Sequence, residues 1–478
     1  MGITSFKKQF ENLADPCGLA VFRVLYSTVL LLEVLQLLKF KHLIFDRDPY
    51  LAPGEVKIEV IAMLWIPALI LLAVGYQTRL AAFVNYLLGV IVFSSSHRFE
   101  YHVFYTYIGI SLLVLLFPVS RVWSIDSLLK VKTRPAREIH YLMPVFVGVG
   151  LFYYDSVFYK WASPMWLQGL GLWLPSSFPH VALTDLSGLL NQKWLVIFLS
   201  HFVLVFETVF VFLMWFRKWR IPLMIIGIGF HVGIGIAYPI PYFAATYILL
   251  YLLLMPPVVW RRIFQPTVNK IKPTLLKWVK PLASFAVAHP PMLKSPSGKS
   301  WMIIVVVLLV SQTLIIFHLM PKPPADAYKK LAGVGRHSVF LDYHFKGYNH
   351  IIKVDYLAPG KRETLPIINN DGSPGAWVSG ITWRNITFDV VSPQLEEDKI
   401  TKRLTPYLLM YLRENNLKAG RFEIFIKEMD TPNGWERDFL KRQYAHPWTL
   451  AGRCEVRDKK AQYAWSAQTL ELFKKERE

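Results

Sequence analysis

Eight ionisable side chains lie inside or at the edges of hydrophobic runs that are long enough to cross a bilayer. Each would cost roughly 2.5 to 3.5 kcal/mol at the centre of a lone inserted helix, so a membrane protein rarely keeps so many without a buried use for them. They predict a polar site enclosed by a helical bundle, built for chemistry or for conduction. The eight residues are Arg23, Glu33, His102, Asp155, Lys160, His201, Glu207 and His231.

Lys160 stands at the outer end of one apolar run, in the stretch FYYDSVFYKWASPMW. A lysine in this position often reaches toward the lipid headgroups, and the neighbouring Tyr159 and Trp161 are typical of a membrane interface. A lysine held in apolar surroundings has a second use, because burial disfavours its charged form and makes the free amine available as a base. Asp155 lies five residues earlier, on another side of the helix, so we do not expect it to neutralise Lys160.

Two histidines are candidates for the same site. His102 opens an apolar run and could orient Lys160, relay a proton or bind a quinol hydroxyl, or it could be an ordinary interfacial histidine. His231 lies in the middle of a run, in IGIGFHVGIGIAYPIP, where the glycines leave room for a ligand. We predict a ligand-binding or structural hydrogen-bonding role for His231.

The remaining buried charges favour structural roles. Arg23 and Glu33 are ten residues apart, close to three helical turns, so both can face the bundle interior and pair with other helices. His201 and Glu207 are six residues apart and lie on largely different faces, so Glu207 is predicted as a third structural buried charge. No histidines or carboxylates have the spacing of a metal motif such as HExxH, and no metal site is predicted.

The composition is that of a polytopic membrane protein, since 54% of the 478 residues are hydrophobic and 15% are aromatic. The net charge of +20 does not indicate nucleic-acid binding, because the basic residues concentrate in loops between the apolar runs. Nine runs have about the length that a hydrocarbon core of about 30 Å requires, and they predict nine transmembrane helices. The runs cover residues 18–38, 59–76, 80–97, 101–118, 140–160, 194–216, 221–238, 242–259 and 301–319.

The basic loops predict the orientation. Lys7 and Lys8 precede the first run, the motif RKWR (217–220) separates the sixth and seventh, and further basic residues fill the loop after the fourth run and the segment 260–300. All of them lie on one side if the N-terminus is cytoplasmic. With nine spans the C-terminal region is then extracytoplasmic, and we expect a bacterial inner membrane. Residues 271–285 predict an amphipathic helix on the anionic cytoplasmic leaflet.

The composition becomes polar after the ninth run. The motif MPKPP (320–324) predicts a stiff linker, which divides the chain into a transmembrane domain at 1–320 and a β-rich, α+β extracytoplasmic domain at 325–478. Alternating patterns predict strands at 350–358, 377–391 and 421–429. Leucines and tyrosines at helical spacing predict one helix at 396–416.

Four stretches resemble the HTTM family, the membrane domain shared by vitamin K-dependent γ-glutamyl carboxylase and its bacterial relatives. The similarity covers about residues 10–320 and extends more faintly into the C-terminal domain, and the order of the motifs and the number of spans also agree. The stretches are ADPCGLAVFRVLY (14–26), HVFYTYIGISLLVLLFP leading into SRVWSIDSLL (102–129), YKWASPMWLQG (159–169) and FHVGIGIAYPIPYFAATYILL (230–250).

The resemblance implies that Lys160 is the base that deprotonates a reduced quinone, with His102 in the same site and His231 as the match of a histidine in a later span. The implied chemistry is oxygenation of the quinol, which creates a strong base for the carboxylation of glutamate by CO₂. Tyr101 and Tyr159 stand where the carboxylase has Asn and Lys, so an amide donor is missing beside His102. Besides His231, we expect Tyr101, Tyr159 and Trp161 to contact the cofactor.

Three functions remain open from the sequence. The first is an enzyme that uses a reduced quinone to modify a secreted or membrane-associated peptide or protein. The second is a non-carboxylating accessory factor whose β-rich domain binds a client protein and assists its maturation or export. The third is a transporter with a path of intramembrane charges, which the large outer domain and the absence of evident inverted repeats disfavour.

Overall fold

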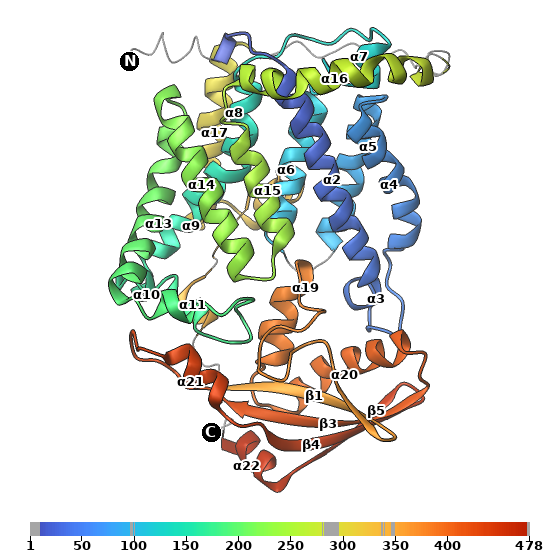
Figure 1. The fold of residues 1–478 in the computed structure, drawn as a ribbon, viewed down its shortest axis with the longest axis vertical. Coiled ribbons are helices and arrows are strands. Elements are labelled where there is room, and N and C mark those ends of the chain that lie inside the picture. The colour runs from blue at the N-terminus through green and yellow to red at the C-terminus, as the bar shows by residue number, and fades with distance from the viewer. Residues whose placement is uncertain are drawn as a thin grey trace.

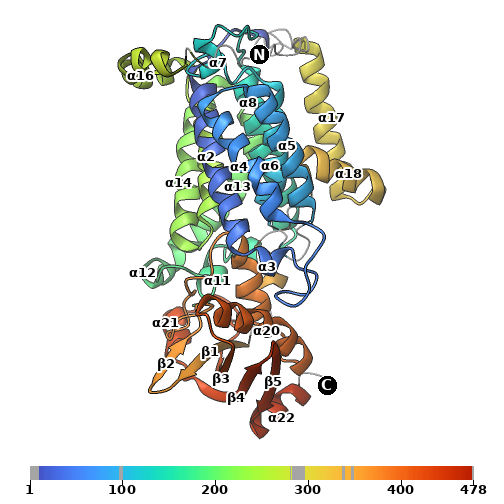
Figure 2. The same cartoon turned by 90° about the vertical axis from the view of Figure 1, so that its right-hand side faces the viewer.

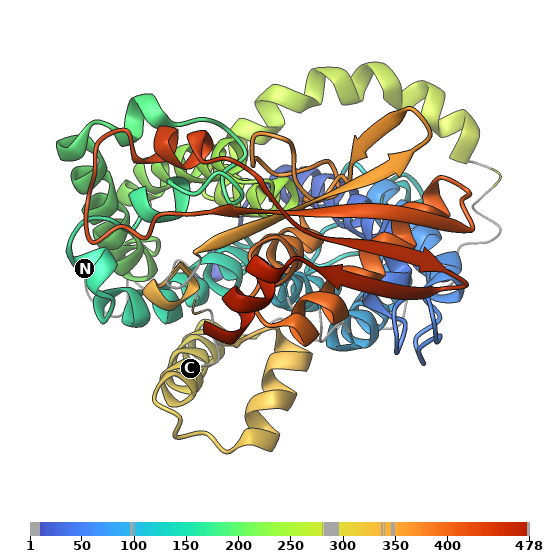
Figure 3. The same cartoon turned by 90° about the horizontal axis from the view of Figure 1, so that it is seen from below.

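The computed structural model describes residues 10–95, 101–279, 296–335, 340–345 and 349–475, together with residues 99, 281 and 338. A bundle of long helices forms one part of the molecule, and a five-stranded sheet with its own helices lies across one end of that bundle (Figure 1). Seen along the bundle axis, the sheet extends beneath the helices, while α17 and α18 form an arm at one side (Figure 3).

Helices occur at all nine predicted ranges, and within the described residues six of them are long and apolar enough to cross a membrane. Two of the others, α4 and α6, are shorter apolar helices. In α8–α9 the helix is interrupted by the π-helix η2, Phe146–Gly150, between α8, Ile139–Val145, and α9, Leu151–Trp161. The other elements are α2 (Cys17–Lys39), α4 (Ile58–Val74), α5 (Thr78–Ser95), α6 (Val103–Leu116), α13 (Lys193–Leu213), α14 (Arg217–Ala237), α15 (Pro241–Leu252) and α17 (Gly298–Ile316).

The eighth predicted span, 242–259, is wrong in its extent. Helix α15 ends at Leu252, and α16, Pro257–Val279, follows after a bend of 106°. Consecutive prolines at 256 and 257 explain the break, because proline lacks an N–H donor and disfavours a helical conformation in the residue before it. If the bent pair counts as one span, the number of candidate spans is seven.

Helix α16 lies across the end of the bundle opposite the sheet (Figure 2). The predicted amphipathic helix, 271–285, is therefore confirmed over its first part, although the helix begins earlier than predicted, and residues 282–285 lie outside the described residues. Trp278 is 77% exposed on this helix, beside several lysines. This combination of side chains is typical of a helix that lies on a lipid surface.

Glycine lets two helices of the bundle approach closely at the π-helix. A Cβ atom at Gly148 would lie 2.5 Å from Cδ1 of Leu250 on α15, so no larger residue fits without a shift. The proline and glycines of the fifth run predict this interruption of the helix. In the structure, the interrupted segment packs closely against α15.

Short helices complete the bundle. Four of them belong to the segments that connect long helices along the chain: α3 (Lys41–Ile44), α10 (Pro164–Leu167), α11 (Trp173–Ser176) and α12 (Ser187–Leu190). The motif MPKPP does not form the predicted linker, because α18, Lys322–Ala332, begins inside it and has prolines in its first turn, where no N–H donor is required. Helix α18 returns to the bundle, where the carbonyl of Leu331 accepts a 2.7 Å hydrogen bond from Tyr86 Oη.

The C-terminal region is an antiparallel sheet with strand order β2-β1-β3-β4-β5. The strands predicted at 350–358 and 421–429 are confirmed, as is the helix at 396–416, which is α20, Glu397–Glu414. Further strands and helices in this region were not predicted. The strands are β1 (His350–Ala358), β2 (Lys361–Thr364), β3 (Ala419–Glu428), β4 (Thr449–Arg457) and β5 (Lys460–Trp465), and the added helices are α21 (Phe439–Ala445) and α22 (Ala467–Lys475).

The strand predicted at 377–391 is wrong. This segment forms α19, Ile381–Arg384, which continues as the π-helix η5, Asn385–Val391. Its apolar residues Ile386, Val390 and Val391 are buried at helical spacing, so packing outweighed the preference of β-branched residues for strands.

The turn before α19 joins the two parts of the molecule. Gln36 at the end of α2 donates a 2.8 Å hydrogen bond to the carbonyl of Ser379 and accepts one of 3.2 Å from the backbone N–H of Ile381. Between them, Gly380 has φ +54°, and a Cβ atom there would lie 2.4 Å from Oε1 of Gln36. Only glycine fits this close approach in this conformation.

Candidate functional site

An ion pair is buried within the helical bundle. Lys160, near the end of α9, donates to both carboxylate oxygens of Glu207 on α13, each at 2.7 Å from Nζ. The two residues are 4% and 2% exposed. A buried pair of this kind is costly to desolvate and contributes little net stability, so it is more often kept for a specific use.

Local structure encloses the ammonium group. Helix α9 ends directly after Lys160, and Ser163 caps the following short helix α10 by accepting from the N–H of Trp166. This turn brings the indole ring over Lys160, with Nζ 4.5 Å from the ring centroid. The cation thus contacts a carboxylate and an aromatic face, both of which favour its charged form.

His231 lies beside this pair, on α14. Its ring stacks on Tyr247 of α15 with a centroid distance of 4.8 Å and an interplanar angle of 3°, and it is within electrostatic range of Lys160. Nδ1 is 3.0 Å from the carbonyl oxygen of Gly227, and this bond makes Nδ1 the protonated nitrogen. Nε2 is buried and has no hydrogen-bond partner among the described residues, so it offers an acceptor to a ligand.

Three tyrosines surround the ion pair and the histidine. Tyr251 donates a 2.8 Å hydrogen bond to Tyr153 Oη, and both hydroxyls, like that of Tyr247, are within electrostatic range of Glu207. All three side chains are buried. We call this buried cluster of Lys160, Glu207, His231 and the three tyrosines the Lys160–His231 compartment. Its side chains are mostly aromatic, as in many sites that bind flat apolar rings.

A second buried carboxyl group lies on α2. Glu33 is 0% exposed and accepts a 3.2 Å hydrogen bond from Tyr107 Oη, which itself accepts one of 3.1 Å from Thr246. Oε1 of Glu33 has no hydrogen-bond partner among the residues that the structure describes. Tyr101 is within electrostatic range of both Glu33 and Tyr247.

The structure brings together only some of the residues expected in the site. Lys160 and His231 share one compartment, whereas His102 is the half-buried residue before α6, and its neighbour Tyr101 belongs to the group around Glu33. Tyr159 is half-buried beside Lys160. Trp161 is 48% exposed and donates to Thr208 Oγ1 at 3.1 Å, on the outer surface of α9 and α13.

The other buried charges hold helices together. Arg23 donates to the carbonyl oxygens of Val119 and Trp123 at 3.0 and 2.8 Å, and so ties α2 to the loop after α6. Asp155 accepts a 2.8 Å hydrogen bond from Gln312 of α17.

The tyrosines of the site were not predicted from the sequence, although the spacing of those on α15 indicates a shared helix face. Phe243, Tyr247 and Tyr251 recur every four residues and therefore lie on one face of α15. The partner of Lys160 was missed because Glu207 is 47 residues away in the chain. Among the described residues, no group of three His, Cys, Asp or Glu side chains is arranged to hold a metal ion.

Comparison with known proteins gives one match. Residues 12–260 match the HTTM domain. No curated protein and no solved structure matches the chain. The matched range contains Lys160, Glu207, His231 and the tyrosines around them.

Proposed function

The chain belongs to the HTTM domain family, and from this premise we propose that it is an integral membrane enzyme resembling vitamin K-dependent γ-glutamyl carboxylase. It uses a reduced quinone, oxygen and CO₂ in the buried compartment to modify a secreted or membrane-associated peptide or protein. The observation that carries this proposal is the buried Lys160–Glu207 ion pair within electrostatic range of His231, whose Nε2 has no hydrogen-bond partner in the described part of the chain.

The residues of the compartment fit a quinol ring. The stacked rings of His231 and Tyr247 offer flat apolar contacts, and Nε2 of His231 accepts a hydrogen bond from a ligand hydroxyl. A reduced quinone supplies acidic hydroxyl groups and the reducing equivalents for a reaction with oxygen. The apolar walls exclude water, which would otherwise quench a strong base.

The Lys160–Glu207 ion pair can accept a proton from the ligand in two steps. Transfer of one proton from Nζ of Lys160 to a carboxylate oxygen of Glu207 turns two buried charges into two neutral groups, an amine and a carboxylic acid. Neutralising both groups removes the cost of desolvating two charges, which offsets the loss of the attraction between them. The amine then accepts a proton from a ligand hydroxyl, and the ammonium group that forms pairs with the ligand oxyanion.

The proposed topology has nine membrane-crossing segments, a cytoplasmic N-terminus and an extracytoplasmic C-terminal sheet, in a bacterial inner membrane. It is supported by the basic loops, since α16 and the loop after α6 lie at the end of the bundle opposite the sheet (Figure 1). Positively charged loops remain on the cytoplasmic side. The bilayer, the quinone and a peptide or protein client are the partners of this proposal.

Substitution of Lys160 by arginine tests the proposed base. Arginine keeps a cation opposite Glu207 but stays protonated, so the fold is retained while the base is lost. We expect carboxylation of a glutamate-containing peptide, measured as incorporation of labelled CO₂ with a reduced menaquinone, to fall about 10² to 10⁴-fold. Lys193→Arg, on an exposed lysine of α13, is the matched control and should keep full activity.

Two results would contradict the proposal. If Lys160→Arg remains as active as the wild type, the lysine is not the base. If the wild-type protein neither binds a quinone nor incorporates CO₂, the chain is not an enzyme of this type.

The accessory-factor alternative is favoured by one observation. Strand β5 is the last strand of the sheet and pairs only with β4 among the described strands, which leaves one edge to which a client strand could add. In that case Lys160→Arg would be silent, and a proline in the centre of β5 would abolish client binding. A pull-down of secreted proteins with both variants separates the two functions.

A further inference from the structure

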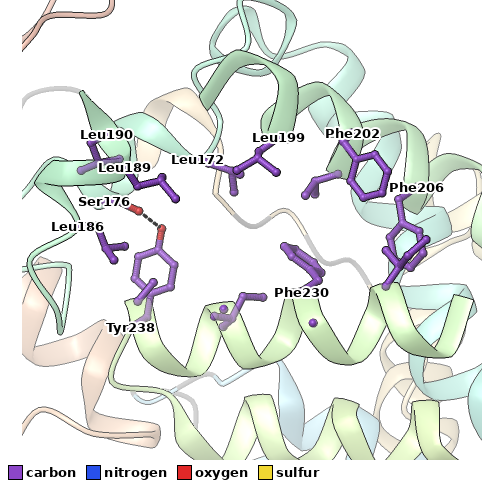
Figure 4. A pocket seen from close by; sticks show the side chains of 16 residues that line it. Leu172, Ser176, Leu186, Leu189, Leu190, Leu199, Phe202, Phe206, Phe230 and Tyr238 are labelled. Carbon is purple, nitrogen blue, oxygen red and sulfur yellow. Dashed lines mark hydrogen bonds between the residues drawn. The ribbon is translucent and has the colours of Figure 1, made fainter. Parts of the chain in front are cut away.

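A hollow of about 310 Å³ lies between α13 and α14, near the end of the bundle that carries the sheet. Its walls are almost entirely hydrocarbon, contributed by residues such as Leu172, Leu199 and Phe202 (Figure 4). The only polar side chains among the lining residues are Ser176 and Tyr238, which hydrogen bond to each other at 2.8 Å. The described walls of the hollow therefore offer no free polar side chain to hold a polar group.

Two glycines create this space. A Cβ atom at Gly229 or Gly233 would meet nothing within 4 Å, although both residues lie within α14. The rim is apolar and open, since the lining residues Phe202 and Leu189 are 40% and 38% exposed. In a bilayer such a rim faces the lipid chains, so the hollow can be entered sideways from the hydrocarbon core.

A single layer of aromatic side chains separates the hollow from the buried ion pair and His231. Phe206 and Phe230 line it, and they directly precede Glu207 and His231 in the chain. The rings of Phe230 and His231 are in contact, with centroids 5.1 Å apart. A ligand with its ring beside His231 would therefore have this hollow next to it on the lipid side.

We infer that the hollow binds the hydrocarbon tail of the quinone whose ring occupies the Lys160–His231 compartment, an inference that rests on the proposed function. A cavity of about 150 Å³ holds one benzene molecule, so the volume found here holds about a dozen carbon atoms, or two to three isoprene units. The rest of a longer tail extends through the open rim into the bilayer. The polar ring is excluded from the hollow because no polar group among its lining residues is free to bind it.

Filling the hollow tests the inference. Gly233→Leu places a branched side chain in the open space, and it should not harm folding because glycine is the poorer helix former by about 1 kcal/mol. Val232→Leu, on the exposed side of the same helix, is the matched control. The probes are a menaquinone with four isoprene units and a photoreactive diazirine at the end of its second unit, ring-only menadione, and a fatty acid carrying the same diazirine.

We expect the tailed quinone to label peptides of α13 and α14 in the wild type and in Val232→Leu, and the labelling to fall at least tenfold in Gly233→Leu. Binding of menadione, measured by competition in detergent, should change less than twofold in all three proteins. This pattern places the tail in the hollow and leaves the ring site intact.

Three outcomes would overturn the inference. If menadione binds but the tailed quinone labels other helices, the tail lies elsewhere and the proposed function is untouched. If the fatty acid labels the hollow as strongly as the tailed quinone, the occupant is a bilayer lipid. If the wild type binds neither quinone, the proposed function fails and this inference fails with it.

Discussion

The bundle buries two glutamates in different ways. Glu207 accepts two short hydrogen bonds from the Lys160 ammonium group, whereas Glu33 accepts one from Tyr107 and has one oxygen without a hydrogen-bond partner among the described residues. A carboxylate beside a cation keeps its charge in an apolar interior, and a carboxyl group beside neutral hydroxyls is favoured in its neutral form. Glu207 is therefore suited to proton exchange, whereas Glu33 fixes the positions of helices.

The largest expected effect comes from breaking the ion pair. Lys160→Met leaves Glu207 buried without a cation, which should lower the free energy of unfolding by about 3 to 5 kcal/mol. The double variant Lys160→Met with Glu207→Gln removes the stranded charge and should recover more than half of that loss. Thermal unfolding in detergent measures both, and a double variant no more stable than the single one would contradict the buried ion pair.

The tyrosine network around Glu33 should matter less. Tyr107→Phe removes the hydroxyl that donates to Glu33 and accepts from Thr246, at a cost of about 1 to 3 kcal/mol for the unsatisfied groups. The same unfolding measurement checks this value. A change below about 0.5 kcal/mol would mean that the hydrogen bonds to Tyr107 are replaced by others.

A third kind of ionisable group is the half-buried His344, which lies outside the long helices and whose effect on stability depends on pH. Burial lowers the pKa of His344 to about 4, and Nδ1 accepts a 3.1 Å hydrogen bond from the N–H of Leu341. Between pH 6.5 and 4 the unfolded chain binds a proton that the folded chain does not, so stability falls as the pH falls through this range. We expect a loss of about 1 kcal/mol at about pH 5, allowing for solvent screening.

The variant His344→Asn should remove this part of the pH dependence. Melting temperatures of wild type and variant, compared at about pH 7.5 and about pH 5, provide the measurement. Equal pH dependence in the two proteins would show that the imidazole is not responsible.

The smallest effect on the free energy of unfolding is expected from Glu33→Gln. The variant to compare with it is Glu207→Gln. The amide oxygen introduced by Glu33→Gln still accepts from Tyr107, so we expect a change below about 1 kcal/mol. Glu207→Gln leaves Lys160 without its carboxylate and should cost several times as much. Similar losses in the two variants would contradict the distinction between the two glutamates.

The sequence predicted an element correctly where the spacing of apolar residues within that segment was enough to define it. The helix at α20 and the strands β1 and β3 were predicted with errors of about two residues, because helical or alternating spacing of apolar residues is a property of the segment itself. The segment 377–391 carries β-branched residues in an alternating run, yet it folds as helix. Burial of Ile386, Val390 and Val391 at helical spacing favours the helix, and a local pattern does not contain that packing.

A bundle of apolar helices with charges buried among them follows from the amino-acid sequence, since hydrophobic length and the cost of burying charge are properties of each segment. The same sequence also singled out Lys160 and His231. Only the tertiary structure decided that Lys160 pairs with Glu207, that Tyr247 stacks on His231, and that two glycines of α14 leave a hollow beside them. These contacts join residues on different helices, and the packing of those helices sets which faces meet.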